Sequence, residues 1–215
     1  MNELRQTLAT DFLPQFLAGM LVNFQIAAIS LVIGLALGLL LALARLSGGV
    51  WGAMAVPVVA LMRAAPTFVV MFFLLNAIPR DATLWGLPVA PSGVMMVALS
   101  LVPYSAAYIA DSGVEALGHL RGGSPLGALL FLPNITRAFF VLVMSSSAGA
   151  AIGVSEGVAI ILRQAEQLPS LDDRLVVFAI GIVLFGIPLQ AGFAVVRFVQ
   201  ARLGRIALQR REGAV

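Results

Sequence analysis

One long run without charge constrains this chain more than any other feature. Residues 12–44 are 33 consecutive residues with no Asp, Glu, Lys or Arg, and most of them are aliphatic or aromatic. About 20 such residues cross the hydrocarbon core of a bilayer as a helix. A soluble domain has about 25% charged residues, whereas this chain has 11% charged and 60% hydrophobic residues. The sequence therefore predicts an integral membrane protein.

Composition also excludes several classes of function. The chain has no Cys, which excludes disulfides and thiolate metal sites, and the single His119 cannot form a metal site alone. The Arg residues are scattered between apolar runs, so we expect no nucleic-acid partner. Residues 1–15 carry Glu3, Arg5 and Asp11 and lack the pattern of a cleavable signal, so we expect the first apolar run to remain as an anchor.

The apolar runs predict five membrane-spanning helices in one all-α domain, residues 1–215. Residues 51–62 between the first two spans are expected to form an interfacial helix. We place Pro66 in the first turn of the second span, where a missing N–H costs little, and we expect Pro103 to kink the third. The expected fold is a polytopic membrane helical bundle, with spans at residues 16–44, 64–79, 91–110, 135–154 and 175–198.

The distribution of Arg residues predicts the orientation. With an external N-terminus, four Arg lie outside (Arg5, Arg80, Arg163 and Arg174) and nine lie inside (Arg45, Arg63, Arg121, Arg137, Arg197, Arg202, Arg205, Arg210 and Arg211). Cytoplasmic loops of membrane proteins carry the excess of positive charge. We therefore expect a cytoplasmic C-terminus and a cytoplasmic polar bend at residues 115–134. The basic tail from Arg202 onward is expected to bind anionic lipid headgroups.

Four segments then resemble a known family. They are LARLSGG at residues 43–49, LMRAAPTFVVMFFLLNAIP at 61–79, AAYIAD at 106–111 and AIGVSEGVAIILRQAEQLPS at 151–170. Their order and spacing are similar to those of permease subunits of bacterial ATP-binding cassette (ABC) importers for polar amino acids, the histidine/glutamine permease type. The resemblance covers nearly the whole chain. It implies a type I importer bundle in the bacterial inner membrane.

The resemblance also implies the partner subunits and the transport mechanism. A second permease subunit, identical or different, would complete a pathway that operates by alternating access. ATP-binding subunits and a periplasmic or lipid-anchored substrate-binding protein would join it, with amino acids or similar small polar solutes as substrates. ATP would be bound by the partner subunits, because this chain has no phosphate-binding loop. No catalytic residue, cofactor or metal is therefore expected on this chain.

The sequence departs from the family pattern at three places. Ala64 and Ala65 replace the family's Gly-Thr between Arg63 and Pro66, and Asp111 stands where the family has Glu. About 20 residues of the family pattern are missing before Leu132-Pro133-Asn134, so the coupling helix that contacts the ATPase is expected to be shortened or absent. One alternative function is therefore a degenerate permease that acts as a scaffold for its partner without productive ATPase coupling. A channel or proton-coupled carrier is disfavoured, because the predicted spans lack Asp, Glu and Lys.

Polar residues in the predicted spans are the candidates for the substrate path. They are Ser145, Ser146 and Ser147 in the fourth span and Asn23 and Gln25 in the first. The alternative for the serines is close packing of helices. Since polar groups in lipid need partners, we expect Asn23, Gln25 and Gln190 to point into the bundle.

Charged residues outside the spans give two further sets of candidates. Asp111, Glu115 and Arg121 are candidate contacts with the ATPase, and a solvated turn over residues 115–121 is the alternative. Glu156, Arg163 and Glu166 follow the fourth span at helical spacing, which predicts an ion-pair network. They are candidates for docking the binding protein, and the alternative is a solvated helix end.

Overall fold

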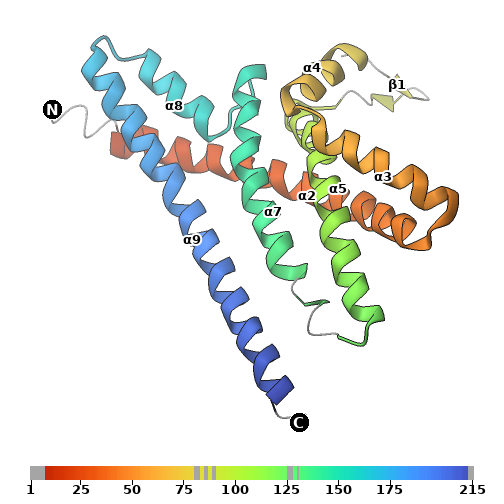
Figure 1. The fold of residues 1–215 in the computed structure, drawn as a ribbon. Helices are drawn as coiled ribbons and strands as arrows, with labels where there is room; N and C mark the ends of the chain where they lie inside the picture. Colours follow the sequence, from red (N-terminus) through yellow and green to blue (C-terminus); the bar gives the residue numbers. More distant parts are fainter. Residues whose placement is uncertain are drawn as a thin grey trace.

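The fold is a bundle of long helices, seen in a computed structural model (Figure 1). The structure describes residues 8–79, 83–84, 87–88, 91–124, 128–129 and 131–212. The elements are η1 (Leu8–Phe12), α2 (Leu13–Ser47), α3 (Gly49–Ala64), α4 (Thr67–Ala77), β1 (Thr83–Leu84), β2 (Leu87–Pro88), α5 (Gly93–Arg121), α7 (Phe131–Ser145), η2 (Ser146–Ile152), α8 (Gly157–Glu166) and α9 (Leu171–Glu212). The two short strands pair antiparallel, with Thr83 opposite Pro88. The expected all-α membrane bundle is confirmed.

Four helical segments are long and apolar enough to cross a membrane: Thr10–Ser47, Gly93–Arg121, Phe131–Ile152 and Leu171–Arg202. A fifth crossing would require the pair α3 and α4, which is bent by 96°. The structure has separate helices where residues 51–62 and 64–79 were predicted, with shifted ends, but the 11 residues of α4 are too few for the predicted second span to cross a membrane alone. Ala65 is extended, since the ring of Pro66 disfavours helical geometry in the residue before it.

Two other predicted spans end elsewhere. Helix α5 continues through Pro103 to Arg121, so the predicted bend over residues 115–121 is wrong and these residues are helical. The chain turns instead at Gly122 and Gly123, where Gly123 has a φ of 75°. The predicted fourth span is α-helical to Ser145 and then tightens into the 3-10 helix η2, which ends at the left-handed Gly153.

Helices α2 and α5 run parallel and form the centre of the bundle. Glycines on α2 bring the two backbones together: a Cβ on Gly38 would lie 2.7 Å from the Ala106 carbonyl oxygen, and a Cβ on Gly34 would lie 1.9 Å from Ser105 Oγ. Around this pair the largest core cluster joins α2, α4, α5, α7 and α9, with its fully buried side chains including Ile26, Met71, Val97, Leu101 and Leu142. Many of the outward aliphatic and aromatic side chains are exposed, as expected of a lipid-facing surface.

Helix α9 lies along α7 and α8 and then continues past the first residue of α7 (Figure 1). A second core cluster joins its start to α8 and to the start of α2, through Phe12, Phe16, Met20, Ile161, Ala165 and Val177. The third cluster packs Val59 of α3 on Ala107 and Ala110 of α5. The second cluster therefore fixes α8 and the start of α9 against the start of α2.

Candidate functional site

A buried polar cluster joins α2 to η2 and to the start of α8, more than 120 residues further along the chain. Asn23 of α2 donates one hydrogen bond to Ser146 Oγ at 2.8 Å and one to Glu156 Oε2 at 2.9 Å. Its own Oδ1 accepts from the backbone N–H of Gly157 at 2.9 Å. All three side chains are fully buried. We call Asn23, Ser146 and Glu156 the polar cluster.

Glu156 is held in the cluster as the N-cap of α8. Its backbone is extended, and its carboxylate accepts from the N–H groups of Val158 and Ala159, each at 2.9 Å. Such bonds satisfy N–H groups that the first turn of a helix leaves without a partner. A Cβ on Gly19 would lie 2.9 Å from the Glu156 carbonyl carbon, so α2 and the start of α8 are in direct backbone contact.

The electrostatics of Glu156 follow from this burial. Glu156 lies between η2 and α8, outside the candidate spans. Burial raises the pKa of its carboxyl above the usual value, and the hydrogen bonds from Val158, Asn23 and Ala159 oppose that rise. The sequence did not reveal a buried carboxyl here. Ser155 is the residue type usually preferred as an N-cap, but Ser155 is exposed and Glu156 caps the helix.

The other candidates for the path lie around the cluster. Ser146 faces into this chain and donates to the Val143 carbonyl at 2.7 Å, which fits the alternative of helix packing. Ser145 and Ser147 are half-buried. Gln25 and Gln190 are exposed, so the prediction that they point into the bundle is wrong. Of the three amide side chains, only that of Asn23 points into the bundle. A path-lining role for Ser145, Ser147 and Gln25 stays a prediction.

The expected network of Glu156, Arg163 and Glu166 is wrong. The ion pairs among the described residues are those that Asp111 makes with Arg45 and Arg63. Glu156 is turned into the protein to cap α8 and has no exposed surface to offer a docking protein. Arg163 and Glu166 are exposed. A docking role for these two stays a prediction.

Asp111 ties three helices together at the other end of α2. Its Oδ1 accepts from Arg45 Nη1 at 2.7 Å, and its Oδ2 pairs with Arg63 at the end of α3. Arg121, ten residues further along α5, donates to the Leu46 carbonyl at 3.4 Å. Arg45, Arg63 and Arg121 therefore lie at one end of the bundle. Glu115 and Arg121 are exposed, and an ATPase contact by Asp111, Glu115 or Arg121 stays a prediction.

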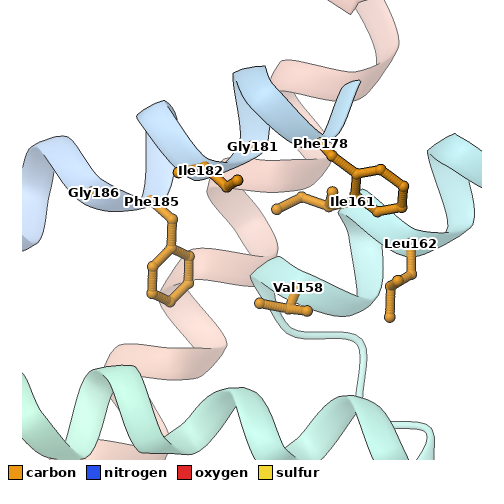
Figure 2. Close-up of a pocket in the computed structure, with 8 residues that line it drawn as sticks. All are labelled: Val158, Ile161, Leu162, Phe178, Gly181, Ile182, Phe185 and Gly186. Carbon is orange, nitrogen blue, oxygen red and sulfur yellow. The ribbon is translucent and has the colours of Figure 1, made fainter. Parts of the chain in front are cut away.

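An apolar cavity of about 320 Å³ lies between α8 and α9 (Figure 2). No lining residue has a polar side chain, so the cavity does not suit a polar solute. Gly181 leaves room for Ile161, because a Cβ there would lie 2.5 Å from Ile161 Cδ1. The lining residues are Val158, Ile161, Leu162, Phe178, Gly181, Ile182, Phe185 and Gly186. Within the described part of the chain, no three His, Asp or Glu side chains gather where they could hold a metal ion.

Comparison with known proteins gives one informative result. No family model matches the sequence. No curated protein matches it either. Among solved structures, the fold is similar to that of a chain in the crystal structure of an amino acid ABC transporter with histidines, with a TM-score of 0.66 and 16% sequence identity. The match covers 88% of this chain and 94% of that chain. This protein is thus a membrane-embedded chain with the fold of an ABC transporter component.

Proposed function

We propose that this chain is the transmembrane permease subunit of an ATP-driven ABC importer. The observation that carries the proposal is the fold match, which extends over 88% of this chain and 94% of the amino acid transporter chain. The four segments that resemble histidine/glutamine-type permeases support the same function. The proposed substrates are amino acids or similar small polar solutes, and the proposed place is the bacterial inner membrane, with the N-terminus outside.

The chain would supply half of the pathway and none of the ATP chemistry. It contains no Lys, and the usual phosphate-binding loop requires one. ATP would therefore be bound and hydrolysed by partner subunits. A second permease subunit, identical or different, and a substrate-binding protein would complete the complex. The exposed amide of Gln25 supports such a partner, because an amide that faces lipid has no hydrogen-bond partner.

The polar cluster would position the external end of this half-pathway. It ties α2 to η2 and α8 by hydrogen bonds between side chains 123 and 133 residues apart. Ser145 and Ser147 flank Ser146 at this junction. We assign the cluster to holding the junction in place, and the half-buried Ser145 and Ser147 and the exposed Gln25 to contact with solute or with the partner permease.

Purification of the tagged chain from its native membrane tests the proposal. We expect ATPase subunits to co-purify, and proteoliposomes of the complex with the binding protein to take up amino acids when ATP is inside. A Walker-motif variant of the ATPase is the matched control and should abolish uptake. Uptake by this chain alone, driven by a proton gradient, would refute the importer and favour a carrier.

One observation favours the alternative of a scaffold without productive coupling. Nine residues, 122–130, separate α5 from α7. As a helix they would reach about 14 Å, which leaves no length for flanking turns. We therefore propose an asymmetric complex in which the ATPases contact mainly the partner permease, and this chain makes at most a shallow contact through Glu115 and Arg121.

Reversing the charges of Glu115 and Arg121 tests the proposed asymmetric complex. Glu115→Arg with Arg121→Glu should change substrate-stimulated ATP hydrolysis in the reconstituted complex little, because a power stroke passes only through contacts that differ between states. Asp172→Asn, at the opposite end of the bundle and outside the docking candidates, is the control for a change of surface charge. Near-complete loss of stimulation in an assembled complex would show instead that this end couples the chain to its ATPase.

A further inference from the structure

Two arginines from different helices line one cavity at the α7–α9 interface. The cavity has a volume of about 200 Å³ and lies between Arg137 of α7 and the face of α9 that carries Arg197. The α9 residues recur at the spacing of a single helix face. Both Arg side chains are exposed, while Val196 is buried beneath them. The remaining lining residues are Phe193, Arg197 and Gln200.

An aromatic contact closes the interface on one side of this cavity. A Cβ on Gly192 would lie 2.1 Å from Phe140 Cζ, and the Phe140 and Phe193 ring centroids are 5.7 Å apart. Arg137 precedes Phe140 by about one turn of α7, and Arg197 follows Gly192 by more than one turn of α9. The antiparallel helices therefore meet tightly at Gly192, and the cavity opens beside it, towards the end where α7 begins.

The two arginines of the cavity have no acidic partner among the side chains that the structure describes. Arg137 and Arg197 lie inside the candidate spans Phe131–Ile152 and Leu171–Arg202. The salt bridges among the described side chains are those of Asp111 with Arg45 and Arg63. Neither Arg137 nor Arg197 takes part in them. An unpaired Arg inside a membrane span is unfavourable, and two that share a cavity also repel each other. The arrangement therefore favours a bound anion.

We propose that this cavity binds the phosphate headgroup of an anionic phospholipid. Guanidinium groups match phosphate oxygens with paired hydrogen bonds, so Arg137 and Arg197 would bind the phosphate from two sides. The Gln200 amide would bond to the glycerol or headgroup, and Phe193 would contact the start of an acyl chain. Lipid can enter laterally, because Val195, Phe198 and Val199 beside the cavity are exposed. On the proposed orientation this end is cytoplasmic, where anionic lipids concentrate.

Lipid binding to the purified full chain, with any subunits that co-purify, tests the site. Detergent-solubilised protein is titrated with phosphatidylglycerol or phosphatidylcholine of the same acyl chains, and native mass spectrometry measures the bound lipid. We expect one phosphatidylglycerol to bind about tenfold or more tighter than phosphatidylcholine. Arg137→Gln with Arg197→Gln should weaken phosphatidylglycerol binding by about 10- to 30-fold, from the contribution expected of two arginines.

Matched variants distinguish binding at this cavity from general electrostatic attraction between the protein and anionic lipid. Arg121→Gln with Arg163→Gln removes the same charge from exposed positions outside the cavity and outside the basic tail. It should leave the affinity for phosphatidylglycerol near that of the wild type. If the Gln pair does not fold, Arg137→Lys with Arg197→Lys should keep the preference for phosphatidylglycerol with weaker binding, since Lys cannot form the paired bonds.

Four results would overturn the proposal. Equal binding of the two lipids is one, and wild-type affinity of the Gln pair for phosphatidylglycerol is another. Displacement of the lipid by millimolar inorganic phosphate would identify a soluble anion as the ligand. Loss of the second permease from the Gln pair, with phosphatidylglycerol binding unchanged, would assign the two arginines to acidic residues of that subunit.

Discussion

At the scale of single residues, Asn23 has the most connections across the fold. Its amide uses both donor and acceptor atoms, to Ser146, Glu156 and the backbone of Gly157. The sequence identifies Asn23 and Ser146 as polar residues in apolar spans. It could not pair them, because no local rule relates residues 123 positions apart. The burial of Glu156 could not be predicted, because Glu is almost never fully buried unless it has a partner, and its partner Asn23 is 133 residues away.

Asn23→Ala should destabilise the protein by about 1–3 kcal/mol, because it leaves the buried Gly157 N–H without its acceptor and removes one hydrogen bond to the Glu156 carboxylate. In a chain of this size the melting temperature should fall by about 2–4 °C for each kcal/mol. Gln25→Ala is the matched control, because it removes an exposed amide from the same helix and should change stability by less than about 0.5 kcal/mol. Equal melting temperatures for the two variants would contradict the role of Asn23.

The buried Glu156 predicts a pH dependence with a definite sign. Its folded-state pKa is raised from the ordinary 4.5, so the folded protein holds this proton more tightly than the unfolded chain. The stability that Glu156 contributes is complete below pH 4.5 and is lost as the pH rises through the raised pKa. Melting temperatures measured in detergent from about pH 4 to pH 8 should show this fall in the wild type.

Glu156→Gln cannot titrate, so this component of the pH slope should disappear in that variant. Glu166→Gln is the control, because Glu166 is exposed on the same helix and its variant should keep the wild-type slope. The same slope in Glu156→Gln and the wild type would show that another group causes the dependence.

At the scale of elements, the parallel packing of α2 on α5 depends on small residues. Gly38 faces the Ala106 carbonyl and Ile109 Cβ, each 2.7 Å from the position of an added Cβ. Neither atom can move aside by a side-chain rotation. Small residues at such interfaces let membrane helices approach closely. Hydropathy locates both helices in the sequence, but it carries no information on which glycines face which neighbour.

Gly38→Ala should therefore destabilise the bundle by about 1–3 kcal/mol through overpacking. Gly118→Ala is the matched control, because Gly118 is helical, exposed and has nothing within 4 Å of an added Cβ. That change should be neutral or stabilise the chain by up to about 1 kcal/mol, from helix propensity alone. Thermal unfolding in one detergent compares the pair. A stable Gly38→Ala with an unstable Gly118→Ala would contradict the packing of α2 on α5.

Element boundaries were harder to predict than the elements themselves. Hydropathy located α2, α5, α7 and α9, because each carries an apolar run of nearly membrane thickness. It failed beside Pro66, where α3 extends to Ala64 and α4 has only 11 residues, too few to cross a membrane alone. It also ended α5 at Ala110, because Asp111 is charged. A charge ends an apolar run without ending a helix, and Asp111 lies within α5, where it pairs with Arg45 and Arg63.

At the scale of the whole molecule, the Arg distribution and the fold agree on which residues share an end. Asp111 gathers Arg45 and Arg63, and Arg121 contacts the end of α2. Arg137 and Arg197 line one cavity near the start of α7. Counting charges predicts this grouping from the sequence. The fold by itself does not say which end faces the cytoplasm, so the orientation rests on the excess of Arg at one end.

Single cysteines in this cysteine-free chain test that orientation. Ser124 follows α5 at the Arg-rich end, and Asp172 begins α9 at the opposite end, with α7 between them. In intact cells an impermeant maleimide should label Asp172→Cys and not Ser124→Cys, and permeabilisation should expose both, with the unaltered chain as the background control. The reverse pattern would invert the topology. Labelling of both in intact cells would mean that α7 with η2 does not cross the membrane, because Ser124 and Asp172 would then lie on one side.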